Sequence, residues 1–439
     1  MSLLLRRVCT IKYDILKDLM IRYNDPGMNK LLTTKGMALA LFLLFVPFGT
    51  TVLQAQSAEQ TVKHLVEMGF ENVGWTEDEQ ERVYVLQNSA YRQQGVGVAK
   101  AVDLIQKEGL PESKRCRIVL LNNNVPQISL SYNPVAGDSI PEATRQDWDV
   151  SYELGSTWKQ ARKVVKSNRS LFKVDVVVYP WLMFQNYKLS KMYDYVFQLS
   201  PAIEVSMWKG MKLTAQVVVP VSNDYYGRRY SQVRPGFLTL SQDIRLPYNI
   251  FLKGIVGFYE GGRSGAELRA KYIFPDEHFW LTGRLGVTRK GYWDHWAYYH
   301  GKKWTTDFHL GVHYYWPRFN TEVMLKGERF LMEEYGTQFE MYRHFRYASI
   351  GFYAMKVFGK DDAANNGFNG GFAFRIALPP YKYKRKGYMP RLVAGEFGFR
   401  YNSGNEKQYG SFYRSSPDDN FLVENAYNPY FIKSELLNY

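Results

Sequence analysis

The sequence is poor in cysteine, with only Cys9 and Cys116 among its 439 residues. Cys9 lies in the part of the chain that we expect to be removed, so the mature protein keeps one thiol and forms no intramolecular disulfide. No cysteine lies near the predicted cleavage position, which argues against a lipoprotein anchor. Disulfides are therefore excluded as a source of stability.

Long apolar runs are also scarce, and the only one is ALALFLLFVPFGTTVL at residues 38–53. A basic segment precedes this run and small residues follow it, which is the order of a secretory signal. We expect a signal region over residues 1–55, with translation starting at Met28 and a mature chain beginning near Gln56. No later segment has the roughly 18 to 20 apolar residues that a spanning helix needs, so only β structure could cross a membrane.

Motifs for catalysis and nucleotide binding are missing. The sequence contains no G-x-S-x-G, H-E-x-x-H or Walker loop. Gly95 and Gly97 open a predicted helix, but Lys100 occupies the third glycine position of a dinucleotide fingerprint. We therefore expect no catalytic residue, no cofactor, no metal and no enzymatic activity. A barrel hydrolase with a site assembled from separate strands is the lesser alternative.

Two histidines near an aspartate could indicate a metal site. His309 and His313 share one face of a predicted strand with Asp307. Residues four apart on a strand are separated by about 13 Å, which is too far for both to bind one ion. We interpret these side chains as lining the interior of a barrel.

Aromatic residues are abundant, and they decide between two β architectures. They make up 16% of the chain, with 34 Tyr, although the mean hydropathy is only −0.36. This combination is typical of a membrane barrel with interfacial Tyr and Trp girdles. A Tyr-rich soluble β protein is the alternative.

The first part of the mature chain predicts a small α/β module over residues 56–140. A helix begins after a capping-box pattern at Ser57, and a second helix runs from about Gly97 to Glu108. Hairpin strands lie between the helices, and one or two strands follow the second helix. The order is α-β-β-α-β-β, which is typical of a periplasmic docking domain.

From residue 141 onward the sequence predicts strands. The segment GFYEGGRSGAELRAKYIF at residues 257–274 has a glycine-rich turn, after which apolar residues alternate with Glu267, Arg269 and Lys271. Twelve to fifteen such runs occur, each with one apolar and one polar face. We predict a mainly β fold, a single-chain outer-membrane antiparallel barrel of about 12–14 strands over residues 141–439, with the small module on the periplasmic side. Tyr439 would be the aromatic end of the last strand.

The chain is basic, with a formal charge of +14. Lys and Arg are spread through the alternating strands and do not form one patch, which argues against a nucleic-acid partner. We expect the lumen to be basic and to attract an anionic polysaccharide, with the aromatic segment YWDHWAYY at residues 292–299 offering flat faces to sugar rings. Alternatively, these aromatics form the interfacial girdle and the cations face water. The predicted lumen residues are Lys212, Arg245, Arg269, Lys271, Arg284 and Arg375.

The sequence also resembles the YjbH-type family of outer-membrane proteins associated with exopolysaccharide production. The resemblance is carried by residues 230–272 of the barrel, by LVEMGFENV, YVLQNSAYR and NNVPQISLSY in the module, and by NGGFAFRIALPP at residues 369–380. It implies a non-catalytic accessory role in exopolysaccharide or capsule export, with outer-membrane lipid and other envelope export proteins as partners. A general porin is the alternative.

Overall fold

In the computed structural model, residues 57–134, 143–156, 158–185, 193–224, 227–359, 367–378, 391–393, 396–400, 413–419 and 424–438 are described. The predicted signal region and Tyr439 lie outside these residues. Met1–Ala58 and Glu59–Tyr439 are separate units. None of the described helices is long and apolar enough to span a membrane.

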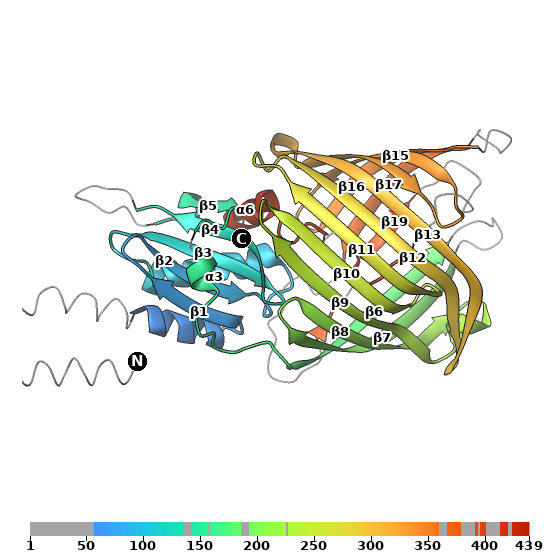
Figure 1. The fold of residues 1–439 in the computed structure, drawn as a ribbon, viewed down its shortest axis with the longest axis horizontal. Coiled ribbons are helices and arrows are strands. Elements are labelled where there is room, and N and C mark those ends of the chain that lie inside the picture. Colours follow the sequence, from blue (N-terminus) through green and yellow to red (C-terminus); the bar gives the residue numbers. More distant parts are fainter. Residues whose placement is uncertain are drawn as a thin grey trace, which may run out of the picture. The chain divides into compact units, whose positions relative to one another are not determined.

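The small module is a five-stranded sheet with helices, as the sequence predicts (Figure 1). The strand order is β1-β2-β3-β4-β5, with β2 and β3 parallel and the other pairs antiparallel. Helix α3 connects the two parallel strands, as such a crossover requires. The elements are a helix at residues 57–67, β1 Glu71–Glu77, β2 Glu81–Gln87, α3 Gln94–Glu108, β3 Arg115–Asn122, β4 Val125–Tyr132, η1 Arg145–Asp147, β5 Trp148–Ser151 and α4 Trp158–Ala161.

The module extends past the predicted boundary at residue 140. Strand β5 pairs with β4, and Trp148 is fully buried. Asn72 on β1 also bonds to Ser170, well beyond the boundary. A four-residue strand has too little alternation to be assigned to one sheet or the other from its sequence.

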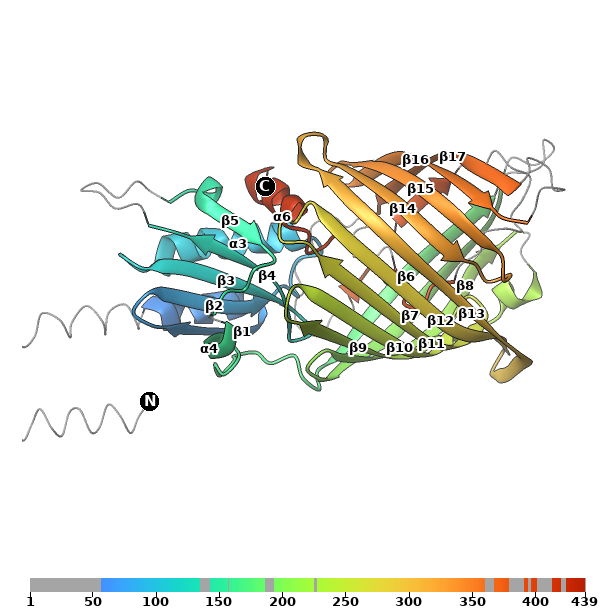
Figure 2. The same ribbon diagram turned by 45° about the horizontal axis from the view of Figure 1, so that its top comes forward.

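The rest of the chain forms a 14-stranded sheet, which confirms the predicted outer-membrane barrel (Figure 2). Consecutive strands from β6 to β17 are antiparallel neighbours, β19 pairs with β17, and β18 pairs in parallel with β6. Only three residues separate the edge strands β18 and β19, so the sheet curls until its two edges meet. The bounds are β6 Val174–Gln185, β7 Asp194–Trp208, β8 Met211–Asn223, η2 Arg228–Ser231, β9 Arg234–Leu246, β10 Ile250–Tyr259, β11 Arg263–Ile273, β12 Phe279–Asp294, β13 Ala297–Trp316, η3 Pro317–Phe319, β14 Thr321–Arg329, β15 Tyr335–His344, β16 Ala348–Val357, β17 Phe368–Ala377, β18 Arg391–Leu392 and β19 Glu396–Arg400.

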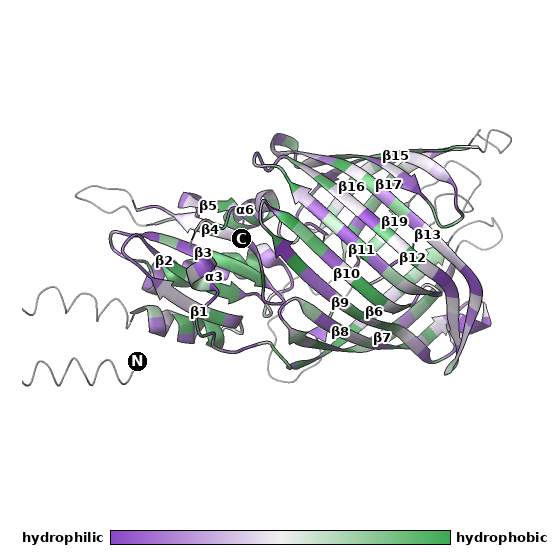
Figure 3. Cartoon of the chain, in the orientation of Figure 1, coloured by the Kyte–Doolittle hydropathy of each residue, from purple (hydrophilic) through white to green (hydrophobic). Residues whose placement is uncertain are grey.

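Apolar and polar residues alternate along the barrel strands (Figure 3). This alternation gives the sheet an apolar outer face and a polar inner face. Val256, Leu268 and Leu310 are 49%, 49% and 69% exposed, whereas Glu267 and Asp307 on the same strands are buried. Soluble monomers rarely expose apolar side chains over so continuous a surface, so the outer face is suited to lipid. The glycine-rich segment is the predicted turn between β10 and β11, where Gly262 has a φ of +81°.

The chain does not end in a barrel strand. Residues after β19 include the segment 413–419 and the helix α6, Pro429–Asn438. The prediction that the barrel extends to residue 439 therefore differs from the structure over these residues.

Candidate functional site in the barrel lumen

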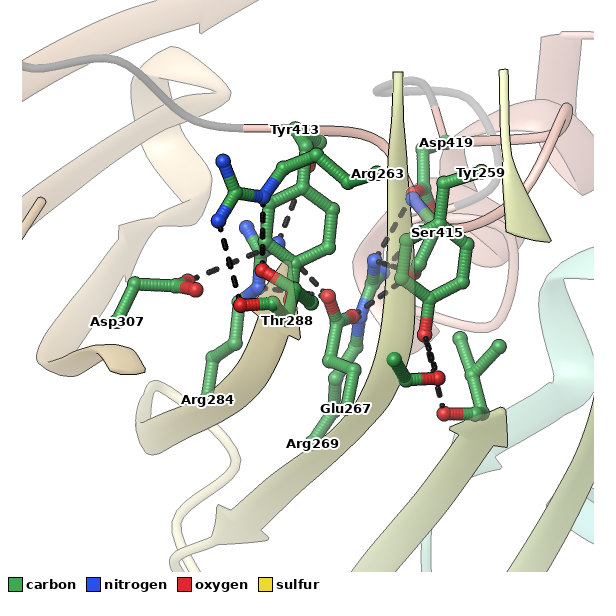
Figure 4. A network of polar contacts seen from close by, with 12 residues as sticks. Tyr259, Arg263, Glu267, Arg269, Arg284, Thr288, Asp307, Tyr413, Ser415 and Asp419 are labelled. Atoms are coloured by element: carbon green, nitrogen blue, oxygen red, sulfur yellow. Dashed lines mark hydrogen bonds and ion pairs between the residues drawn. The ribbon is translucent and has the colours of Figure 1, made fainter. Parts of the chain in front are cut away.

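A buried carboxylate, Glu267, lies in a network of polar contacts inside the barrel (Figure 4). The Glu267 side chain points into the barrel because side chains alternate between the two faces of β11 and the next residue, Leu268, faces outward. Arg284 Nη2 lies 2.7 Å from Oε2, Arg269 Nε lies 2.5 Å from Oε1, and Ser415 Oγ donates to Oε1 at 2.9 Å. A carboxylate so completely desolvated needs such partners to remain charged.

The segment 413–419 supplies the opposite side of this cluster. Arg269 donates to both carboxylate oxygens of Asp419, each at 2.9 Å, and to Ser415 Oγ at 2.8 Å. Asp419 also accepts from the backbone N–H groups of Ser415 and Ser416, at 3.1 and 3.2 Å. These contacts fix the segment inside the barrel through a bidentate pair, the strongest common form of ion pair.

Two further contacts hold the same segment. Asp418 Oδ2 lies 3.5 Å from Lys212 Nζ, which also lies 3.4 Å from Glu204. The Tyr413 ring stacks on Tyr259 at 5.3 Å, and Arg284 lies 4.4 Å from its centroid. Residues from β8, β10, β11 and β12 therefore converge on one short stretch of chain, which we call the lumen segment.

A glycine makes room for the lumen segment. A Cβ on Gly286 would lie 2.2 Å from the Tyr413 hydroxyl and 2.6 Å from Asp307 Oδ1. Asp307 itself is fully buried, 3.9 Å from Arg284 Nη2. Any side chain at position 286 would displace one of these groups.

The three predicted residues of the histidine strand face inward but do not form one site. His313 Nδ1 is 2.9 Å from Glu322 Oε1, and His344 Nε2 is 3.2 Å from the other oxygen of Glu322. Asp307 instead lies beside Arg284. Within the described ranges, no group of His, Cys, Asp or Glu side chains is arranged to hold a metal ion.

The predicted lumen cations have three kinds of partner. Lys212, Arg269 and Arg284 join the cluster around the lumen segment. Arg245 donates to the carbonyl oxygens of Gln127, at 2.7 Å, and of Tyr152, so it connects the barrel to the module. The remaining two contact aromatic rings: Lys271 lies 5.1 Å from the Trp280 ring centroid, and Arg375 lies 4.5 Å from that of Tyr342.

The chain returns from the lumen to the module through helix α6. The backbone N–H of Gly95, in the first turn of α3, donates to Glu435 Oε2 at 2.8 Å. A Cβ on Gly95 would lie 2.1 Å from that oxygen. The N-terminus of a helix favours such an acceptor oxygen. The missing side chain at Gly95 therefore leaves room for Glu435 of α6, where a nucleotide-binding loop would bind a phosphate.

Sequence reasoning located the basic residues of the site together with Glu267 and Asp307, and missed the acidic residues of the lumen segment. The lumen segment reads YRSSPDD, which has the composition of a surface turn, and its partners on the wall are about 150 to 200 residues away. The one available signal was the absence of strand alternation after residue 412.

No model of a protein family matches the chain, and no curated protein sequence matches it. Solved structures of OmpT, an outer membrane protein of Vibrio cholerae, are similar to it, in an in-vitro folded form and in a trimer form. Identities are 9% and 10%, TM-scores 0.25 and 0.27, and the matches cover 47% and 53% of this chain and 82% and 89% of the OmpT chains. A mutant of OmpT lacking loop L8 gives 8% identity and a TM-score of 0.26, over 47% of this chain and 89% of its own.

The prediction that the chain is not an enzyme finds no support in these neighbours, and we withdraw it. A likeness at this level of identity and superposition shows the fold at most, so it assigns no activity to this protein. The outer-membrane assignment is supported by the exposed apolar face of the barrel itself.

Proposed function

We propose that this outer-membrane barrel protein is an accessory in the production or export of a surface polysaccharide, with a lumen segment that an acidic polysaccharide can displace. The resemblance to YjbH-type proteins supports the polysaccharide role. The pairing of Asp418 and Asp419 with Lys212 and Arg269 supports the displacement. An acidic sugar chain carries the same carboxylate groups as these two aspartates, so it competes for the same cations.

The same contacts disfavour a general porin. A porin needs a water-filled channel with free lining charges. Three predicted lumen cations, Lys212, Arg269 and Arg284, are instead bound to acids within the described part of the chain. A lumen that contains a segment of its own chain fits a regulated path better than an open one.

The lengths of the strand connections support a periplasmic position for the module. Outer-membrane barrels have short periplasmic turns and longer outer loops. At the end of the barrel where Glu277 accepts hydrogen bonds from Ser151 and Tyr152 of the module segment, the five hairpin connections from β7–β8 to β15–β16 have two to five residues, and 13 residues separate β17 from β18. At the other end, three connections are equally short, but ten residues join β8 to β9 and β16 to β17.

Deletion of the gene tests the polysaccharide role. We expect the amount or composition of the surface glycan to change and the native gene to restore it. An unchanged glycan would contradict the role.

Displacement is tested on the purified barrel. Hydrogen exchange of residues 413–419 should speed up when a soluble polyuronate is added, and a neutral dextran of the same length is the control. The effect should weaken at high salt, because ion pairs with a flexible polyanion are screened. Exchange that does not respond to polyuronate would contradict displacement, and high conductance of the untreated barrel in planar bilayers would favour the porin.

A further inference from the structure

The hairpin of β12 and β13 extends past the ends of the neighbouring strands (Figure 2). Outward-facing Leu285 and Val287 on β12 are exposed, as lipid contacts require. The next outward residue is Arg289, and its cross-strand partner is Trp304. The outer face therefore changes from aliphatic to cationic and aromatic within two residues.

Arg289 has no acidic partner in the part of the chain that the structure describes. Its guanidinium carbon lies 5.2 Å from the centroid of the Trp304 ring, and Trp304 is 52% exposed. The Nε–H of Arg289 is buried and makes no hydrogen bond to any described residue. A buried Nε–H without a partner costs free energy unless a ligand completes it, and the planar donors of a guanidinium match a phosphate.

A second unpaired donor lies beside it. The indole N–H of Trp293 is also buried without a partner among the described residues. The Trp293 ring lies 5.0 Å from that of its cross-strand partner Tyr298, whose hydroxyl donates to Ser264 Oγ at 2.6 Å. Ser264 is the cross-strand partner of Arg289 on the other side, so these groups belong to one surface. We call Ser264, Arg289, Trp293, Tyr298 and Trp304 the hairpin patch.

We propose that the hairpin patch binds the phosphorylated saccharide head of a glycolipid in the surrounding leaflet. Arg289 holds the phosphate, Trp293 and Tyr298 contact the sugar, and Trp304 lies at the boundary with the acyl chains. The patch adjoins the lipid-facing band at Val287, which favours a ligand anchored in the membrane over a soluble chain. Nearby Lys302, exposed on the same arm, adds positive charge.

The test uses the full mature chain, purified in detergent and placed in nanodiscs with a phosphorylated lipid A-type glycolipid or with its dephosphorylated form. Native mass spectrometry measures the retained lipid. We expect Arg289→Gln to lower retention of the phosphorylated lipid about tenfold, the effect of one lost charge-assisted hydrogen bond, and to leave the dephosphorylated lipid unaffected. Arg318→Gln is the control, because Arg318 likewise lies near an aromatic ring, 5.5 Å from that of Phe319, but is exposed and away from the patch.

Three results would overturn the proposal. Equal retention by the Arg289 variant and the native chain would show that Arg289 does not bind the lipid. Equal retention of the two lipids would show that the phosphate group is not recognised. Arg289-dependent binding of inorganic phosphate or a soluble acidic polysaccharide, without retention of the glycolipid, would show that the ligand is not a membrane lipid.

Discussion

Arg269 is bound by two acids of different origin, Glu267 on its own strand and Asp419 on the lumen segment. The two partners are not equivalent. Loss of Asp419 leaves Arg269 paired with Glu267, whereas loss of Arg269 removes a partner from two carboxylates at once, the buried Glu267 and the half-buried Asp419. A buried charge that is left without a partner costs more free energy than the loss of both members of an ion pair.

We therefore expect Asp419→Asn to destabilise the barrel by about 1 to 2 kcal/mol and Arg269→Gln by about 3 to 5 kcal/mol. The free energy of unfolding, measured by urea titration in lipid vesicles, checks both values. In the double variant the two effects should not add, because the partners share one interaction. Additive effects would show that the Arg269–Asp419 pair is not energetically coupled.

Glu435 gives α6 a pH dependence. Burial raises the pKa of Glu435 from 4.5 to about 7, although the Gly95 N–H and Arg346 act in the opposite direction. A carboxyl with a raised pKa in the folded state favours folding while it is protonated. The attachment of α6 to the module should therefore be strongest below pH 4.5 and weaken as the pH rises to about 7.

Hydrogen exchange of residues 429–438, corrected for the intrinsic pH dependence of exchange, measures this effect. Protection should fall between pH 4.5 and 7 in the native chain. Glu435→Gln keeps the shape and an acceptor oxygen but does not titrate, so its protection should stay constant over that range. The same pH dependence in the Gln variant would assign the effect to another group.

At the scale of elements, the lumen segment depends on the absence of a side chain at Gly286. Gly286→Ala should displace Tyr413 and loosen residues 413–419, because the added carbon would approach the tyrosine hydroxyl to 2.2 Å. Limited proteolysis of the reconstituted barrel should then cut within this segment more than tenfold faster.

Gly327→Ala is the matched control, since a Cβ at this strand glycine would meet nothing within 4 Å. It should leave the proteolysis rate unchanged. A Gly286 variant with native resistance to cleavage would mean that Tyr413 does not need this space.

The elements themselves were largely predictable. Alternation is a local property, so the strand after the glycine-rich turn, β11, could be recognised from Ala266 to Phe274 alone. The partners of its inward residues could not, because Arg269 and Asp419 are 150 residues apart and no periodicity relates them. Helix α6 was missed for a related reason: its apolar residues Ile432 and Leu436 are buried, but the segment is short and its sequence was interpreted as an irregular strand.

At the scale of the whole molecule, the proposed orientation places the module in the periplasm and the β12–β13 hairpin outside the cell. Single cysteines at Gln80, in the module, and at Lys302, on the hairpin, test this arrangement. An impermeant maleimide should label Lys302→Cys on intact cells and Gln80→Cys only after the outer membrane is permeabilised. The native Cys116 is fully buried and should stay unlabelled. The reverse labelling pattern would invert the proposed topology.

The bond between Gly95 and Glu435 joins residues 340 positions apart. This contact therefore cannot form until the chain has been made as far as Glu435. Contacts of such long sequence separation slow folding, because the chain loses much entropy before they form. Docking of α6 onto α3 should consequently be a late step in folding, slower than the pairing of neighbouring barrel strands.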